Sequence, residues 1–479
     1  MPTFPSTGDE LPFIVTTPSM PSVEANRKTI RSYAMRGRNR KKRPMRPSSW
    51  INGGKVETSG NPNLGQAFPI MPKVGGEFSF TAVPEDLGPE LLEIIWKLRN
   101  VTPSLEFGPA SSQEEALWLE PVLTDIACFH FTMFISKMYL DYLKGHADNT
   151  WDALAHHTKA LNVLQRRLLA GNMDISTSDS TVLTVVGLTT AALAFGDADI
   201  AQKHMVGLHR MVTLRGGISA FSHDRRLQAK LCRVDLGVAL STGCEALFFS
   251  EGLSWSPYLP PQARKKAQTI EEGSSSLLNF LGGLDARIHL VWDDLKAYSQ
   301  AANMAARCGL EMDTVLYQEA MVSIHYRLTR LIFELGSINE TIRLALLAFA
   351  SSVFLQGGGV WVRHEHLYRC SRKSFIRAKE RKHDFPPQMM LWLYVFCVAL
   401  DAKEPSHSRL RPGLTELLQT QGLRSWDEVR AWLKSVLWVN KIHDAIARDF
   451  VEEMLSAAEN GSQMVSELAA EALSHGCDP

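Results

Sequence analysis

Hydrophobic residues recur three and four positions apart along most of the chain after about residue 89. This spacing places them on one side of an α-helix, and no stretch shows the strict apolar and polar alternation of a strand. Short polar turns separate segments of roughly 15 to 20 residues, an ordinary length for a globular helix. The pattern predicts an all-α fold, in which helical hairpins pack into one large domain over residues 89–460, built as one or two lobes and followed by a tail at 461–479.

The limits of each helix follow from where its apolar pattern begins and ends. Pro121 interrupts one helix, the serines at 274–276 mark a loop, and the basic stretch 364–383 is expected to be exposed. The expected helices are 91–98, 114–143, 151–170, 180–195, 201–215, 224–249, 285–307, 313–335, 338–355, 388–402, 425–439 and 441–455.

The stretch from Lys203 to Phe249 predicts two consecutive helices around which the rest is arranged. The first carries its apolar residues on one face and should end at Gly216 and Gly217, because glycine enters the left-handed conformation that closes many helices. The second is expected to begin near Asp224 and to continue to Phe249. Its small residues would let a neighbouring helix approach closely; they are Gly237, Ala239, Gly243 and Ala246.

These two segments resemble the central signature of the fungal-specific transcription-factor domain family. In that family a His-x-x-Gly-Leu-x-x-Met-Val-x-x-Arg-Gly-Gly helix precedes a helix with an Asp-x-x-x-Ala-x-x-x-Gly core. Arg233 departs from the family, which often has an aromatic residue there. The matching positions here are His204, Gly207, Leu208, Met211, Val212, Arg215, Gly216, Gly217, Asp235, Ala239, Gly243 and Phe248.

The resemblance covers most of residues 89–455, and the string IRSYAMRGRNRKK also looks like an N-terminal segment of some regulators of this family. It implies a nuclear transcription regulator whose helical body senses a small-molecule effector or binds other transcription regulators. The family's usual DNA reader is a zinc cluster of six cysteines, but no cysteine precedes Cys128 here. Because zinc thiolate sites need those ligands, this module is absent, and a co-regulator is an open alternative to a DNA-binding regulator.

Residues 1–88 are rich in proline, glycine and serine, and this composition predicts a disordered arm. Within the arm, residues 27–46 contain ten basic side chains and no acid. Removing these ten from the 51 basic residues leaves 41 against 51 acidic ones, so the remainder carries a formal charge of about −10. The chain is therefore a basic arm on an acidic body.

The densest part of this arm is typical of a nuclear-import signal, a nucleic-acid contact, or both. Side chains that neutralise phosphates release counterions, so such an arm would bind DNA with marked salt dependence and little sequence preference. The alternative is a solvated tail without a partner. The residues concerned are Arg36, Arg38, Arg40, Lys41, Lys42, Arg43 and Arg46.

No motif for catalysis, phosphate binding or metal binding is present. The GxxxxGK, GxGxxG and Gly-x-Ser-x-Gly patterns are missing, so no cofactor and no catalytic residue are expected. His364, His366 and Cys370 form a loose three-ligand set without a fourth ligand, and we interpret them as a surface cluster. Seven dispersed cysteines favour buried thiols in a reducing compartment over a disulfide framework.

Asp235 is the best buried acid in the sequence. Buried acids are usually paired, which favours a salt bridge with Arg210 or Arg215 over a ligand or switch contact. If the chain were an enzyme acting on a small metabolite, His204, His209 and Asp235 would be the first residues to substitute. A third possibility is a scaffold that uses its apolar helices as a homo- or hetero-oligomer interface.

Two uncharged stretches, 180–196 and 344–362, are long enough to compare with a membrane span. The first is short and rich in threonine, and three consecutive glycines break the second, so neither is expected to cross a bilayer. The start of the sequence has prolines and acids in place of a basic and then apolar signal peptide. We therefore expect a soluble protein of the cell interior without a membrane partner.

Overall fold

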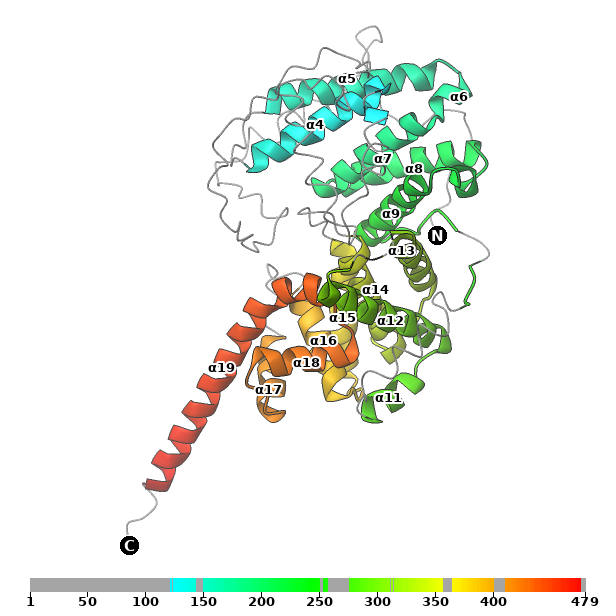
Figure 1. Ribbon diagram of the computed structural model, residues 1–479. Coiled ribbons are helices and arrows are strands. Elements are labelled where there is room, and N and C mark those ends of the chain that lie inside the picture. Colours follow the sequence, from blue (N-terminus) through cyan, green and yellow to red (C-terminus); the bar gives the residue numbers. More distant parts are fainter. Residues whose placement is uncertain are drawn as a thin grey trace.

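The computed structural model describes residues 121–122, 124–143, 150–249, 253–256, 275–310, 312, 314–355, 364–399 and 410–474. Helices make up 80% of this part and it contains no strand, which confirms the all-α prediction (Figure 1). The arm at 1–88 with its basic segment 27–46 and the helix expected at 91–98 lie outside the described residues.

A first group of helices lies at the N-terminal side of the described chain. In it α4 and α5 pair as a hairpin, α7 and α8 form a second hairpin, and α9 lies beneath them (Figure 1). Gly187 lets α7 approach α4, since a Cβ at this position would lie 2.2 Å from the ring of Phe131. The elements are α4 (Ile126–Leu143), α5 (Thr150–Leu169), α6 (Met173–Ser176), α7 (Asp179–Ala194), α8 (Ala198–Leu214), the 3-10 turn η2 (Ile218–Phe221) and α9 (Arg225–Thr242).

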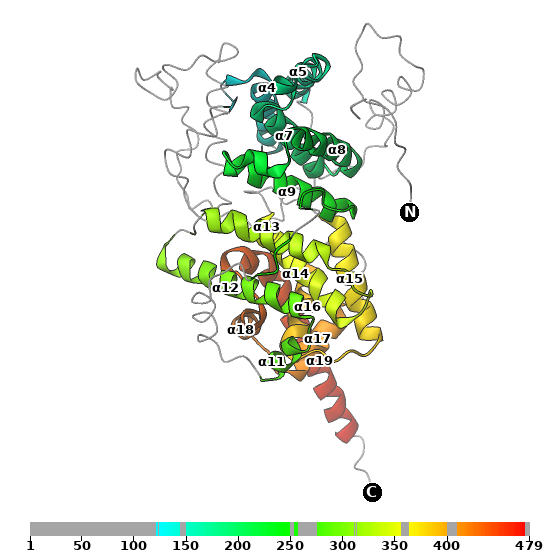
Figure 2. The same ribbon diagram turned by 90° about the vertical axis from the view of Figure 1, so that its right-hand side faces the viewer.

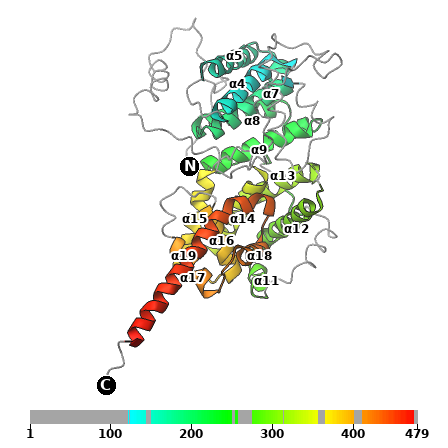
Figure 3. The same ribbon diagram turned by 60° about the vertical axis from the view of Figure 1, so that its left-hand side comes forward.

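A second group surrounds α14, which is buried along almost its whole length. The last helix, α19, runs out of this group as a long rod (Figure 3). The elements are α11 (Ser275–Gly282), α12 (Ala286–Cys308), α13 (Thr314–Arg330), α14 (Ile338–Phe354), α15 (Glu365–Glu380), α16 (Pro387–Ala399), α17 (Arg411–Thr420), α18 (Trp426–Val436) and α19 (Asn440–Ser474).

Helix α9 joins the two groups. It packs against α7 and α8 on one side and against α13 and α15 on the other, and Figure 2 shows it lying between the two groups. Most of the buried apolar residues form one continuous core that reaches from Ala127 to Ala458, while Phe134, Ala153 and Ala191 form a small separate cluster in the first group. The two groups of helices therefore share a single hydrophobic core that passes through α9.

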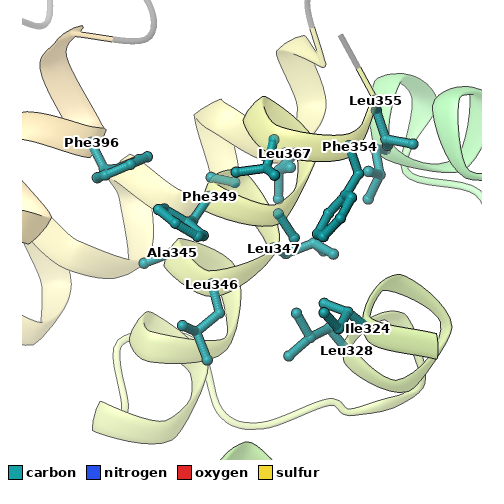
Figure 4. Packing of buried hydrophobic residues seen from close by; sticks show 14 of the residues in the cluster. Ile324, Leu328, Ala345, Leu346, Leu347, Phe349, Phe354, Leu355, Leu367 and Phe396 are labelled. Carbon is teal, nitrogen blue, oxygen red and sulfur yellow. The ribbon is translucent and has the colours of Figure 1, made fainter. Parts of the chain in front are cut away.

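The centre of the second group is filled by large side chains of α14. Figure 4 shows Phe349 beside Phe396 of α16, and Phe354 pointing toward Ile324 of α13. The ring of Phe349 lies 5.5 Å from that of Phe396, centroid to centroid. Such close packing follows from a sequence that is apolar on all sides of the helix, which is typical of a buried element.

The uncharged stretches at 180–196 and 344–362 overlap α7 and α14, both of which are packed inside the core. None of the helices in the described part combines the length and the hydropathy that a bilayer crossing needs.

Of the cysteines in that part, Cys128, Cys232 and Cys397 are buried free thiols, as expected, and Cys308 is exposed. Burial raises the pKa of each buried thiol to about 12, so these three are poor nucleophiles.

Several expected limits were wrong. Helix α9 ends at Thr242 and not at Phe249, because Gly243 adopts a left-handed conformation with φ 82°. Residues 364–383 were expected to be exposed, but α15 buries a face against α9 and α14. A loop was expected at the serines 274–276, where α11 begins at Ser275. Helix α17 was not anticipated, since its ten residues are too short to show a clear period.

Candidate functional site

The turn between α8 and α9 forms as the two glycines predict. Gly216 and Gly217 have φ values of 102° and 89°, and the Gly217 N–H donates to the Val212 carbonyl at 2.9 Å. The Asp224 carboxylate then caps α9 by accepting from the backbone N–H groups of Arg226 and Leu227 at 3.0 and 3.1 Å. The central hairpin is thus closed by local chemistry alone.

The matched signature positions serve packing and connection in this hairpin. The apolar positions on α8 (Gly207, Leu208, Met211 and Val212) are buried, as are Asp235 and Ala239 on α9. Burial lowers the pKa of His204 to about 4, so its ring is neutral at neutral pH.

Arg215 connects the end of α8 to the start of α7. Its guanidinium pairs with Asp179, donates to the Thr177 carbonyl at 3.0 Å and lies 4.2 Å from the centroid of the Phe221 ring. The imidazole of His223 contacts the second Asp179 oxygen at 2.8 Å. Hydrogen bonds from His223 and Arg215 oppose the effect of burial, and the pKa of Asp179 lies below its usual value.

Asp235 is 1% exposed and binds three donors. Its carboxylate accepts from the backbone N–H groups of Leu247 and Phe248 at 2.8 and 3.0 Å, and from the Tyr326 hydroxyl at 2.7 Å. The favoured salt bridge with Arg210 or Arg215 was therefore wrong. The reason is the early end of α9, which lets the chain fold back so that backbone N–H groups reach the carboxylate.

The environment of Asp235 acts on its charge in two opposing ways. Burial raises the pKa of this carboxyl, whereas the hydrogen bonds from Leu247, Phe248 and Tyr326 lower it. The effect of burial is larger, so the pKa of Asp235 lies above its usual value. His209, one of the residues named in the enzyme hypothesis, has its ring 5.9 Å from that of Phe248, centroid to centroid. The carboxylate is engaged with the loop and with α13.

We call residues 243–249 the return loop. Besides Asp235, Arg330 of α13 holds it, since one guanidinium nitrogen donates to the carbonyls of Ala246 and Phe249 at 3.4 and 3.3 Å. Phe249 has a positive φ of 52°, and its ring lies 4.9 Å from that of Tyr326. The loop is therefore fixed to α9 at one end and to α13 at the other.

Replacing Gly243 tests the start of the return loop. A Cβ there would lie 2.4 Å from the His366 ring, on a residue whose φ is 82°. We expect Gly243→Ala to lower the free energy of unfolding by about 2–3 kcal/mol, roughly 1–2 of it from the left-handed backbone and the rest from the clash. Chemical denaturation followed by circular dichroism measures the loss.

Gly309 provides the matched control. It caps α12 with the same left-handed geometry and the same N–H to carbonyl bond, but no atom lies within 4 Å of its Cβ position. Gly309→Ala should cost only the backbone part, about 1–2 kcal/mol, and His366→Ala should recover much of the difference in the Gly243→Ala chain. Equal losses at the two glycines would contradict the clash.

We call Arg233 of α9, His325 of α13 and His364, the residue before α15, the polar junction, because each holds a buried nitrogen atom and Arg233 and His364 each interact electrostatically with His325. The His325 Nδ1 lies 2.8 Å from the Met321 carbonyl and so carries the proton, which leaves Nε2 as an acceptor. The His364 Nδ1 lies 3.1 Å from the Ser241 hydroxyl. Within the described part of the chain, Arg233 Nε, His325 Nε2 and His364 Nε2 are buried without a hydrogen-bond partner.

Both histidines of the polar junction are neutral at neutral pH. Burial lowers the pKa of His325 to about 4 and that of His364 to about 3, with a smaller contribution from Arg233 at His325 and from His325 at His364. Buried polar groups are normally paired with protein or with ordered water. The Arg233 Nε is thus a buried donor and the His325 Nε2 a buried acceptor that no group of the described residues pairs.

The junction also corrects the interpretation of the histidine and cysteine cluster at the start of α15. His364 is 1% exposed and was wrongly expected at the surface, while His366 Nε2 lies 3.4 Å from Cys370 Sγ. No group of three or more metal-ligating side chains occurs among the described residues. Sequence reasoning missed Tyr326, Arg330 and His325 because α13 lies about 90 residues from Asp235 and carries no motif.

A scan against protein-family models, a search of curated proteins and a search of solved structures each find no match to this chain.

Proposed function

We propose that this protein is a fungal transcriptional regulator or co-regulator. In this proposal the basic arm directs nuclear import and makes sequence-independent contact with DNA, and the helical body responds to an effector or to partner regulators. The resemblance of the central hairpin to the fungal-specific transcription-factor domain supports the class of protein. The proposal includes a co-regulator that reaches specific DNA sites through a partner regulator.

The observation that carries the proposal is the separation of charge along the chain. Residues 27–46 hold ten basic side chains and no acid, while the rest of the chain carries about −10. A polyanion attracts such an arm and repels the body, so contact with DNA is confined to the arm. The same composition is typical of import signals.

In this proposal the polar junction is the part of the helical body that responds to an effector. The polar junction presents unpaired hydrogen-bonding groups from three helices, one of which is α9. A ligand held there would touch elements of both helix groups, because α9 packs on each. Such a contact is a physical route from a small molecule to the arrangement of the body.

A helical scaffold is the second candidate, favoured by one observation. Among the described residues, most of the large apolar side chains that remain exposed lie between Trp151 and Leu214, in the first helix group. Exposed apolar surface of this kind often marks an interaction site. An enzyme has less support, because the Asp235 carboxylate is held by the return loop and by Tyr326.

Changing the densest basic residues tests the nuclear role. A fluorescently tagged chain with alanine at Arg38, Arg40, Lys41, Lys42 and Arg43 should stay in the cytoplasm of a fungal cell, because importing receptors need the charge. The matched control exchanges Arg for Lys and Lys for Arg at the same five positions, and it should enter the nucleus. A nuclear signal from the alanine variant would refute the import role.

A further inference from the structure

We propose that Cys370 is a peroxide-sensitive thiol, which is oxidised to the sulfenic acid with the help of His366 and Arg369 beside it. We call these three side chains of α15 the thiol cluster. The proposal assigns a modification site to the basic stretch 364–383, of which the proposed function uses only His364. It holds whether or not the chain is a transcription regulator.

The thiol cluster lies in the first two turns of α15. The His366 Nε2 lies 3.4 Å from the Cys370 Sγ, and the His366 Nδ1 lies 3.4 Å from a guanidinium nitrogen of Arg369. Cys370 and His366 are half-buried, whereas Arg369 is exposed. Cys370 is thus partly open to solvent, unlike the three buried thiols of the described chain.

The two contacts of His366 decide where its proton lies. A guanidinium only donates hydrogen bonds, so the Nδ1 that faces Arg369 is an acceptor. Burial, and after it the charge of Arg369, lowers the pKa of His366, so the ring carries a single proton at neutral pH, and this proton is on Nε2. The imidazole therefore donates to the Cys370 sulfur, and a donor at sulfur favours the thiolate over the thiol.

Cys308 provides the contrast, because it is exposed but lacks such neighbours. It is the last residue of α12, where the helix dipole disfavours a negative charge. Its thiol has no hydrogen-bond partner among the described residues. Cys370 has Arg369 beside it and Lys373 one turn further along α15, and both of these cations are exposed. Reactive cysteines lie in partly exposed, electropositive surroundings of this kind.

Hydrogen peroxide is the oxidant in this proposal. The thiolate sulfur of Cys370 attacks one peroxide oxygen, so that an S–O bond forms and the O–O bond breaks. The sulfur loses two electrons and the peroxide gains them. The hydroxide that leaves takes up the proton that the thiol released, so one thiol and one peroxide give one sulfenic acid and one water.

Oxidation at this position alters a contact of the return loop. The His366 ring lies against Gly243, where the return loop begins, since a Cβ on this glycine would be 2.4 Å from a ring atom. A sulfenic acid places an additional oxygen on the sulfur that the same ring contacts. The His366 ring therefore links Cys370 to the first residue of the loop.

Thiol labelling of the full, reduced chain tests the proposal, with each cysteine followed by mass spectrometry of its peptide. With limiting iodoacetamide, Cys370 should react about tenfold faster than Cys308, although it is the less exposed of the two. His366→Phe, which keeps a ring without an N–H, and Arg369→Gln should each remove most of this difference, whereas Arg369→Lys should retain much of it. After hydrogen peroxide, dimedone, which traps sulfenic acids, should label Cys370 before Cys308.

A charged reagent separates the electrostatic effect from access to the sulfur. Iodoacetate is close in size to iodoacetamide but is an anion, so cations near a sulfur accelerate its reaction. The ratio of the iodoacetate rate to the iodoacetamide rate should be higher at Cys370 than at Cys308. Arg369→Gln should lower this ratio, and so should high salt, which screens exposed charges.

The proposal fails on any of three results. The first is Cys308 reacting as fast as Cys370, because exposure alone would then set the rates. The second is an unchanged rate at Cys370 in the folded Arg369→Gln chain, which tests the cluster at an exposed position even where His366→Phe does not fold. The third is a folded, peroxide-treated chain in which dimedone does not label Cys370.

Discussion

The full chain is expected to bind double-stranded DNA at low salt, and a chain lacking residues 1–88 is expected not to bind. Each phosphate neutralised by a Lys or Arg releases counterions, so a protein with 6–10 such contacts loses about 10³- to 10⁵-fold in affinity between 50 and 200 mM salt. The ten basic side chains of 27–46 can supply contacts in this number. Fluorescence anisotropy of a labelled duplex over a salt series measures both the affinity and the slope.

Two controls make the result specific. An unrelated duplex of equal length should bind equally well, because phosphates carry no sequence information. A chain with five alanines at the densest basic positions should show a weaker affinity and a shallower slope. Binding that survives removal of the arm would contradict the assignment of DNA contact to it, and no binding by any form would favour the co-regulator.

Asp235→Ala is expected to destabilise the helical body by about 3–5 kcal/mol. The change removes the acceptor of the part-buried Leu247 N–H and of two buried donors, the Phe248 N–H and the Tyr326 hydroxyl, and each unsatisfied buried donor costs about 1–3 kcal/mol. Tyr326→Phe is the matched partial change, since it leaves the return loop bound, and it should cost about 1–2 kcal/mol. Denaturant unfolding followed by tryptophan fluorescence compares them.

The pH dependence of stability gives the same residue a second test. Burial places the pKa of Asp235 in the folded protein above its ordinary 3.8, so the folded state holds this proton more tightly than the unfolded state. The resulting stabilisation is complete below pH 3.8 and is lost as the pH rises through the raised pKa. Asp235→Asn should flatten the profile in this interval, whereas an unchanged slope would contradict the raised pKa.

The elements of the fold were predictable where periodicity and capping agree. Residues 151–170 and 285–307 were expected as helices and form α5 and α12 within a residue or two, because each is a long amphipathic run and Asp285 caps α12. The end of α9 was not predictable in the same way. The apolar residues Leu247 and Phe248 continue the pattern but pack from the return loop, because Gly243 turns the chain first.

The candidate site was half predictable. Asp235 was identified as a buried acid, since it stands among apolar residues of one helix. Its partners were not, because a backbone N–H has no signature in the sequence and Tyr326 is 91 residues away. The burial of His364 could not be predicted either. A histidine flanked by arginines is expected at the surface, and only the packing of α15 against α9 buries it.

Helix α9 has a consequence for how freely this chain can vary. Eleven of its eighteen residues are buried, and they face helices of both groups. A helix on the surface keeps one solvent-facing side on which almost any polar residue is tolerated. Helix α9 exposes only a small part of its surface to solvent. Random substitutions should therefore be rejected more often along Arg225–Thr242 than along α5 or α19, and variation that survives in α9 should come with compensating changes in both of its neighbours.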